Sequence, residues 1–285
     1  MSAPCITVVG SVNLDLVASC ERLPAAGETI LGGVFNRFPG GKGANQALAA
    51  RRLGGETRMI ARVGADAEAD AALALLREDG VGLAACLATP DASTGVALIA
   101  VSADGENQIV VAPGANAALS PEDLPGRIEG ALIGQLETPV ETLLAAAQRC
   151  AGLVSLNLAP AAATPEPLLD RADLLIVNET EADWYGLERL QARSGLTALT
   201  LGARGAVLFR GDEEIARAEP PQVQAVDTTG AGDTFVAALT LALVEGRDPQ
   251  AALGFACAAG ALSTTRPGAQ PALPRRAEVE ALLQD

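Results

Sequence analysis

The stretch Gly40-Gly41-Lys42-Gly43-Ala44-Asn45 places the single lysine of this chain among three glycines, and every other basic residue is an arginine. Glycine lets a backbone approach a ligand closely and adopt angles that other residues avoid. Lysine offers a compact point charge, whereas arginine brings a broad planar fork. The pattern predicts a crowded site in which a small cation meets an anion or a polyhydroxy compound. An ordinary glycine-rich turn with a surface lysine is the alternative.

On both sides of this stretch, short apolar runs alternate with helical patterns. Strands are predicted at residues 6–10, 57–63, 132–136, 153–158, 174–177 and 196–201. Helices are predicted at residues 47–53, 66–78 and 140–149. The chain is 49% hydrophobic but only 2% aromatic, so its core is aliphatic. These features indicate the α/β class: a central, mostly parallel sheet with helices on both faces.

Two stretches interrupt this alternation. Residues 14–20 and 28–38 are predicted as strands, and residues 94–102 and 106–111 flank Asp104-Gly105, which is a hairpin signal. Consecutive hairpins predict a small protruding sheet, built from about residues 14–38 and 94–112, near the strand ends where ligands bind. We therefore expect one domain over residues 1–285 with this sheet as its lid. An ordinary antiparallel edge extension is the alternative.

The composition argues against several functional classes. A net charge of −15 and a pI of about 4.4 disfavour a nucleic-acid partner, although a nucleotide needs only a local positive field. The chain has no histidine, and its five cysteines are scattered, so neither a Cys/His zinc site nor a histidine triad is expected. Without a basic leader or a bilayer-length apolar run, we expect a cytoplasmic protein with free thiols and no membrane partner.

The segment Asp227-Thr228-Thr229-Gly230-Ala231-Gly232-Asp233 precedes an apolar helical run that reaches about residue 244. Its glycines let backbone N–H groups converge at the helix start, where unpaired donors and the helix dipole favour an anion. Asp233 is then placed to take a proton from a hydroxyl beside a phosphate. The alternative is that Asp233 is an N-cap on a glycine turn. Asp227 is a candidate cation ligand and, equally, a candidate turn cap.

Polar residues follow other predicted strands at the edge where ligands bind. Asn178-Glu179-Thr180-Glu181 suits a hydrated magnesium ion, or opens the next helix with a capping box. Thr200-Leu201-Gly202-Ala203-Arg204-Gly205 lines a nucleotide pocket or forms only a hairpin. Asn13 and Asp15 suit hydroxyl recognition or a surface loop. The chain carries neither a Walker A loop nor a G-x-G-x-x-G turn after a strand.

Taken in order, these pieces closely resemble the ribokinase family of carbohydrate kinases over nearly the whole chain. The glycine-lysine stretch and the Gly230-Ala231-Gly232-Asp233 element carry the resemblance most strongly. It also includes residues 10–15, 94–99, 114–120, 135–137, 178–182 and 266–271.

The resemblance implies ATP-dependent phosphorylation of the 5-hydroxyl of D-ribose, with Asp233 as the base. The implied anion hole is made by Gly230, Ala231 and Gly232. The implied sugar-binding residues are Asn13, Leu14, Asp15, Gly41, Lys42, Gly43, Ala44, Asn45, Glu137 and Asp233. The implied nucleotide-binding residues are Asn178, Thr200, Leu201, Gly202, Ala203, Arg204, Gly205, Gly232, Asp233 and Cys257.

The resemblance also implies two metal ions and a partner. Asn178 and Glu181 would hold Mg²⁺, largely through water. The implied K⁺ site is formed by Asp227 and by the carbonyls of Thr229, Ser263, Arg266, Gly268 and Ala272. A second copy of the chain would pack against the lid.

Two alternative functions stay open from the sequence. One is a related kinase for 2-deoxyribose, a hexose or a nucleoside, and the other is a non-catalytic sugar-binding protein on the same fold. The chain also departs from the family pattern: the segment between Asn178 and Thr200 is short, which predicts a trimmed helix beside the nucleotide pocket. Cys257 stands where a histidine is common near the adenine.

Overall fold

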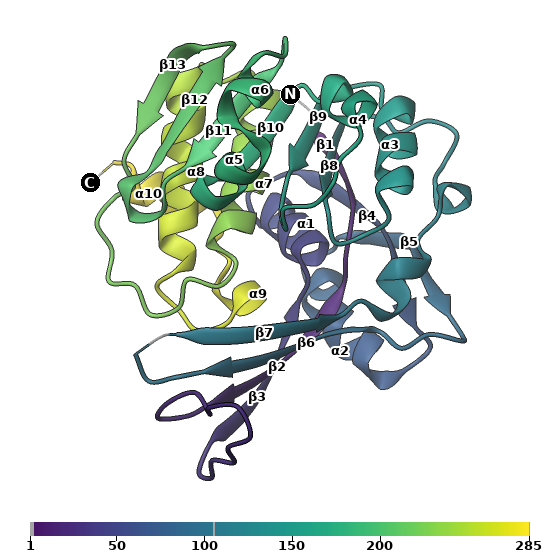
Figure 1. Ribbon diagram of the computed structural model, residues 1–285. Helices are drawn as coiled ribbons and strands as arrows, with labels where there is room; N and C mark the ends of the chain where they lie inside the picture. The colour runs from purple at the N-terminus through teal and green to yellow at the C-terminus, as the bar shows by residue number, and fades with distance from the viewer. Residues whose placement is uncertain (1–2, 105, 285) are drawn as a thin grey trace.

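The computed structural model describes residues 3–104 and 106–284. It contains a nine-stranded sheet between layers of helices, and a four-stranded sheet that projects from it (Figure 1). Gly105, in the predicted hairpin turn, lies outside the described residues, as do both ends of the predicted domain range 1–285.

The strands follow the chain in this order: β1 (Cys5–Val9), β2 (Asn13–Ser19), β3 (Val34–Gly40), β4 (Glu56–Gly64), β5 (Gly82–Thr89), β6 (Gly95–Val101), β7 (Asn107–Ala112), β8 (Ala131–Gln135), β9 (Val154–Asn157), β10 (Leu174–Asn178), β11 (Leu196–Thr200), β12 (Ala206–Arg210) and β13 (Glu213–Ala218). The α-helices are α1 (Lys42–Arg52), α2 (Ala67–Glu78), α3 (Val140–Arg149), α4 (Glu166–Arg171), α5 (Glu179–Tyr185), α6 (Leu187–Gln191), α7 (Ala231–Val244), α8 (Pro249–Ser263), α9 (Ala269–Ala272) and α10 (Arg276–Leu282).

The main sheet confirms the predicted α/β class. Its strand order is β13-β12-β11-β10-β9-β8-β1-β4-β5, and every neighbouring pair from β11 to β5 is parallel. Only β12 and β13 add antiparallel pairs at one edge. Because parallel strands share a direction, the carboxyl ends of β1, β8, β9, β10 and β11 meet at one edge of the sheet.

Two separate aliphatic cores fix the helices to the two faces of this sheet. One core joins the strands to α1, α2, α7 and α8, and the other joins them to α3, α4, α5 and α6. Alternate side chains of one strand enter different cores: on β8, Ile133 enters the first and Leu132 the second. Each such buried leucine or isoleucine stabilises the fold by about 1.5–3 kcal/mol before entropy is counted.

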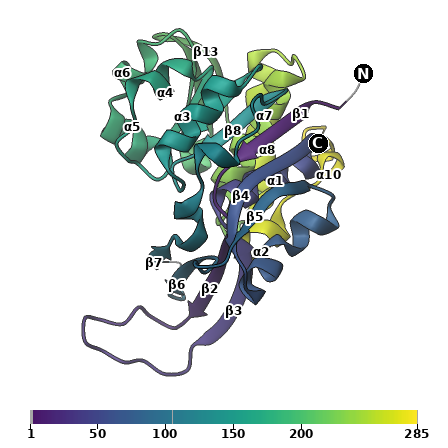
Figure 2. The same cartoon turned by 90° about the vertical axis from the view of Figure 1, so that its right-hand side faces the viewer.

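The small sheet has the strand order β3-β2-β6-β7. Its hairpins β2–β3 and β6–β7 are antiparallel, and β2 pairs with β6 in parallel. Figure 2 shows the sheet below the main body, with the long loop between β2 and β3 reaching furthest from it. Asn13 and Asp15 share one face of β2, so this face of the small sheet carries the polar groups near the main sheet edge.

Four predicted details were wrong or incomplete. The helix after the glycine-lysine stretch begins at Lys42 rather than at residue 47, and the strand predicted from residue 28 begins only at Val34. Strands β5 and β13 were missed because β5 is rich in alanine and β13 is charged, so neither has the β-branched or aromatic residues typical of strands beyond Ile215 and Thr89. No helix among the described residues is long and apolar enough to cross a membrane.

Candidate active site

The start of α1 packs unusually close to the connection between β1 and β2. A Cβ atom on Gly43 would lie 2.6 Å from the backbone nitrogen of Ser11, and one on Gly41 would lie 2.7 Å from that of Asn13. Gly41 also has a φ of +87°, which side chains rarely permit. The glycines are therefore required for backbone contact within the protein, and this contact brings Lys42 to the sheet edge.

Lys42 lies among carboxylates. Its backbone N–H donates to Glu137 Oε2 at 3.2 Å, and Ser11 Oγ donates to the same oxygen at 2.5 Å. Burial opposes the ammonium charge, but the carboxylates of Asp233 and Glu137 outweigh it and raise the pKa of Lys42. The ammonium group is therefore a fixed cation in an acidic setting.

Asn13 and Asp15 are buried beside this cation. The Asn116 amide donates to Asn13 Oδ1 at 2.7 Å and accepts from the Val12 N–H at 2.9 Å, so it fixes the Asn13 side chain. Burial, together with the charge of Glu137 and then of Asp233, raises the pKa of Asp15 to about 7. A cavity of about 360 Å³ lies here, lined by Asn13, Asn116 and Glu137 among apolar residues.

Asp233 is the third residue of α7, and its side chain is buried. The interpretation of Asp233 as an N-cap was wrong, because the N-cap position belongs to Gly230, whose φ of 81° is left-handed. Both carboxylate oxygens of Asp233 accept from α1: Oδ2 from Asn45 Nδ2 at 2.8 Å and Oδ1 from Gln46 Nε2 at 2.9 Å. The lysine stretch and the predicted anion hole are therefore parts of one site.

Two further cavities lie at the start of α7. One of about 140 Å³ is lined by Lys42, Asn178, Glu181, Gly230, Gly232 and Asp233, among others. The other, of about 520 Å³, is lined by Thr200, Gly202, Ala203, Gly205, Gly232 and Cys257, among others. Thr200 and Gly232 border both cavities, so the two are neighbours. Most of the predicted nucleotide-binding residues thus lie around one hollow.

Some predicted residues lie elsewhere. Leu201 and Arg204 do not line the larger cavity, and Arg204 pairs with Glu179 at 2.5 Å. Leu14 is buried on the face of β2 opposite Asn13 and Asp15, so its side chain does not face the site.

Asn178 and Glu181 confirm the capping-box alternative. They form a capping box, in which Asn178 Oδ1 accepts from the Glu181 N–H at 2.8 Å and Glu181 Oε2 accepts from the Asn178 N–H at 2.9 Å. Both also line the cavity that contains Asp233. Burial raises the pKa of Glu181. A cation beside this carboxylate would offset that cost of burial, so the pair fits a magnesium ion bound mainly through water.

Asp227 joins two loops that are far apart in the sequence. Its Oδ1 accepts from the Thr229 N–H at 2.9 Å and its Oδ2 from the Gly268 N–H at 2.8 Å. Gly268 packs against Phe38 of β3, because a Cβ atom there would lie 2.8 Å from the phenyl ring. The carboxylate thus acts as a turn cap that ties the loop before α7 to the start of α9. Of the other predicted potassium ligands, Ser263 ends α8, Arg266 lies between α8 and α9, and Ala272 ends α9.

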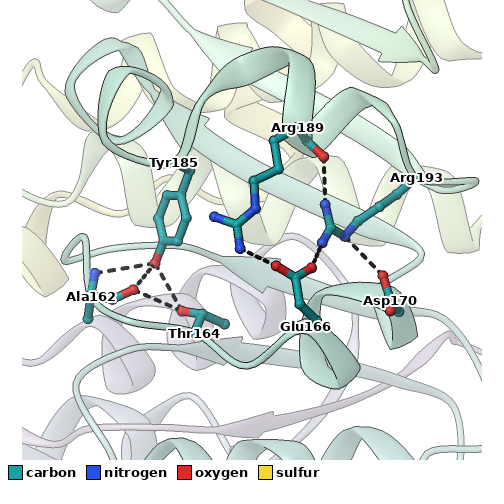
Figure 3. Close-up of polar contacts among 7 residues, drawn as sticks. All are labelled: Ala162, Thr164, Glu166, Asp170, Tyr185, Arg189 and Arg193. Carbon is teal, nitrogen blue, oxygen red and sulfur yellow. Dashed lines mark hydrogen bonds and ion pairs between the residues drawn. The ribbon is translucent and has the colours of Figure 1, made fainter.

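The short segment between Asn178 and Thr200 folds as α5 and α6 and is tied to the loop before α4. Tyr185 Oη donates to the Ala162 carbonyl at 2.6 Å and contacts Thr164 Oγ1 at 3.0 Å (Figure 3). Glu166 pairs with both Arg189 and Arg193 in the same view. These contacts hold α5, whose first residues line the site, although the segment is short.

Sequence reasoning assigned no role to several residues that shape the site. Three of these residues are Ser11, Asn116 and Asn157. Each forms a hydrogen bond with a residue that lies from 19 to 126 positions away in the sequence, and Asn157 also lines the cavity beside Asp233. No local pattern predicts such pairs. Gln46 had one available signal: a glutamine in an otherwise small and apolar helical stretch requires a buried polar partner.

Replacing Asp15 with asparagine should stabilise the protein at alkaline pH. The folded-state pKa of about 7 lies above the ordinary pKa of 3.8, so folded protein binds more protons than unfolded protein between those values. Stability therefore falls as pH rises through this window. We expect Asp15→Asn to raise Tm by roughly 5 °C at pH 8 and to change it little at pH 3.5. Scanning calorimetry at both pH values tests this, with exposed Asp91→Asn as control; equal Tm values at pH 8 would contradict it.

Comparisons with known proteins agree with this geometry. The sequence model of the pfkB family carbohydrate kinases matches residues 4–276. A ribokinase of Bacillus subtilis is 40% identical, over 98% of this chain and 99% of its own. A deoxyribokinase of Salmonella typhi is 35% identical, over 94% of this chain and 95% of its own.

Solved structures show the same likeness in three dimensions. The ribokinase of Thermotoga maritima is 34% identical with a TM-score of 0.88, and the match covers 99% of this chain and 100% of the other. The Arabidopsis thaliana ribokinase complexed with ribose and ATP is 33% identical with a TM-score of 0.85, and the match covers both chains completely. By family match, sequence identity and fold, the chain belongs to the pfkB family of carbohydrate kinases.

Proposed function

We propose that this protein transfers the γ-phosphoryl group of ATP to O5 of D-ribose, giving ribose 5-phosphate and ADP. The observation that carries the proposal is the bond between Asn45 and Asp233, because it joins a polyol-type site at the lysine stretch to an anion site at the start of α7. The Bacillus subtilis and Arabidopsis thaliana relatives, which are ribokinases, support the substrate assignment.

The sugar would bind at the edge of β1 and β8. Asn13, Asp15 and Glu137 offer carboxylate and amide oxygens, and Lys42 and Asn45 offer donors, so neighbouring hydroxyls find acceptors and donors together. Gly41, Gly43 and Ala44 pack against the backbone around Ser11 and Asn13, so they would contribute to the sugar site by bringing Lys42 and Asn45 to it. Burial and then the charges of Glu137 and Asp233 raise the pKa of Asp15, and hydrogen bonds donated by sugar hydroxyls would favour its charged form.

The nucleotide would occupy the larger cavity, with its phosphates directed to the start of α7. The Ala231 N–H already donates to the Thr228 carbonyl at 3.2 Å, so the N–H groups of Gly230, Gly232 and Asp233 are the better candidates for binding oxygens there. Phosphoryl transfer depends mainly on positioning and charge neutralisation, which these donors and Lys42 provide. Asp233, which lines the cavity of about 140 Å³ next to the larger one, would take the proton of the attacking hydroxyl.

Two ions would support this site. Mg²⁺ would be held by Asn178 and Glu181 through water and would supply neutralisation of phosphate charge. K⁺ would be held near Asp227 by the carbonyls of the loops that this carboxylate joins, and would supply local positive charge beside the anion site. The small sheet would close over the sugar and exclude water.

The experiment that tests the function is ADP release from Mg·ATP with D-ribose, 2-deoxyribose, fructose and nucleosides. Turnover that depends on ribose supports the proposal. The deoxyribokinase relative makes 2-deoxyribose a specific alternative substrate. A preference for 2-deoxyribose would support phosphoryl transfer to a sugar but would replace ribose as the assigned substrate. Ribose binding by calorimetry without ADP formation would instead indicate a non-catalytic sugar-binding protein.

Replacing Asp233 with asparagine should nearly abolish turnover. The amide preserves the shape of the side chain but cannot accept the hydroxyl proton. We expect kcat to fall by roughly 10²–10⁴-fold with a modest change in ribose affinity. Stopped-time assays of ADP and calorimetry with ribose measure the two quantities. Near-normal turnover in the variant would show that Asp233 is not the base.

Potassium should activate the enzyme. Asp227 bonds to Thr229 and Gly268 on two loops, so a cation there would stabilise the loop that precedes the anion site. We expect kcat/KM to be several-fold higher in K⁺ than in Na⁺ at matched ionic strength, and the ratio to shrink in Asp227→Asn. Equal rates in K⁺, Na⁺ and salt-free buffer would argue against a potassium site.

We also propose that two copies of the chain associate through the small sheet. Its strands expose Phe35, Leu98 and Val110, and these three share one face by strand register. A second copy would cover this apolar face. We expect a dimer in sedimentation-velocity runs at micromolar concentration, and a monomer for Val110→Glu. A monomeric parent protein would refute this arrangement.

A further inference from the structure

A row of buried amides continues inward from Asp233. The Gln46 side chain, on α1, is fully buried and donates from Nε2 to Asp233 Oδ1 at 2.9 Å. Its Oε1 accepts from Gln135 Nε2, at the end of β8, at 2.5 Å. Gln46 Nε2 also lies 3.3 Å from Asn157 Oδ1 on β9. One glutamine thus connects the candidate base to two strands of the main sheet.

The chemistry of the partners fixes the orientation of Gln46. An ionised Asp233 only accepts hydrogen bonds, so it requires the NH₂ group of Gln46, and this leaves the Gln46 oxygen facing Gln135. Gln135 supplies the NH₂ group that this oxygen needs. Gly10 makes room for Gln135, because a Cβ atom there would lie 1.9 Å from Gln135 Oε1. Reversing Gln46 would place its oxygen against the Asp233 carboxylate and its NH₂ group against the NH₂ group of Gln135.

Asn45 and Gln46 hold Asp233 in different ways. Asn45 belongs to the lysine stretch, where the sugar would bind, and its Oδ1 has no partner among the described residues. Gln46 has partners on both of its amide atoms and no exposed surface. Asn45 can therefore turn toward a ligand, whereas Gln46 has no alternative partner to turn to.

We propose that Gln46, oriented by Gln135, is the positioning residue that holds Oδ1 of Asp233 throughout the reaction, so that Oδ2 is the oxygen that acts as base. This proposal rests on the proposed function of Asp233. As the sugar hydroxyl arrives, Asn45 releases Oδ2. The hydroxyl proton passes to Oδ2, the sugar oxygen bonds to the γ-phosphorus, and the bond from that phosphorus to the β,γ-bridging oxygen breaks as ADP leaves. Asp233 then returns the proton to water.

The test is Gln46→Met, which keeps the length of the side chain and removes its donor. Without the hydrogen bond to a charged acceptor, we expect kcat to fall roughly 10–100-fold, because Oδ2 is no longer aimed at the hydroxyl. KM and the calorimetric Kd for ribose should stay within about threefold. The matched control is Thr142→Val, which deletes another fully buried hydrogen bond, to the Leu119 carbonyl at 2.9 Å, away from the site. The control should keep its kcat.

A double variant separates positioning from general loss of structure. If Gln46 acts through Asp233, Gln46→Met should cost almost nothing further in an Asp233→Asn background. Gln135→Met should reproduce the loss of kcat more weakly, and it serves as the test if Gln46→Met does not fold. Wild-type kcat in Gln46→Met, a loss confined to ribose affinity, or a full additive loss in the double variant would each overturn the proposal. If Asp233→Asn itself stayed active, the proposed function would fail instead.

Discussion

The bonds from Asn45 and Gln46 of α1 to Asp233 of α7 are the contacts on which the site depends. They place a carboxylate within a cluster that already includes Asp15 and Glu137, so the local negative charge is high. Lys42 and the start of α7 offset that charge, and the two helices must therefore lie together. The aliphatic core between α1 and α7 holds them there. The packing of α1 against α7 in the core is thus also what keeps the charged groups of the site close together.

Glycines allow this arrangement at the backbone level. Gly41 and Gly43 let α1 begin directly against the chain after β1, and Gly230 lets α7 begin from a left-handed residue. Both helix starts then point to the same edge of the sheet. Any side chain at Gly43 would push α1 away from Ser11 and move the donors of Asn45 and Gln46 away from Asp233.

The sequence predicted the parallel sheet well because strands such as β8 and β10 are buried on both faces and are therefore continuously apolar. It predicted the start of α1 less well, because three glycines argue against a helix and only their close contacts with residues 10–15 explain them. Charged β13 has Ile215 as its one large apolar residue, so its apolar signal is weak. Within the site, the polar residues at strand ends were predictable from the sequence. The hydrogen bonds of Asn116 with Asn13 and of Gln135 with Gln46 were not, because they join segments about 90–100 positions apart and no local pattern encodes them.

The single lysine of the chain has a practical consequence. Lys42 is the only side-chain amine in the sequence, and it lies among the carboxylates of the candidate site. An amine-selective reagent therefore modifies no other side chain, and its rate of reaction at Lys42, measured separately from that of the α-amino group by peptide mapping, reports on this one position. The neighbouring carboxylates keep the amine protonated and slow to react, so a ligand that alters their charge or covers the lysine changes the labelling rate directly. Because the chain has a single lysine, the labelling rate of Lys42 can be used to detect ligand binding at the candidate site.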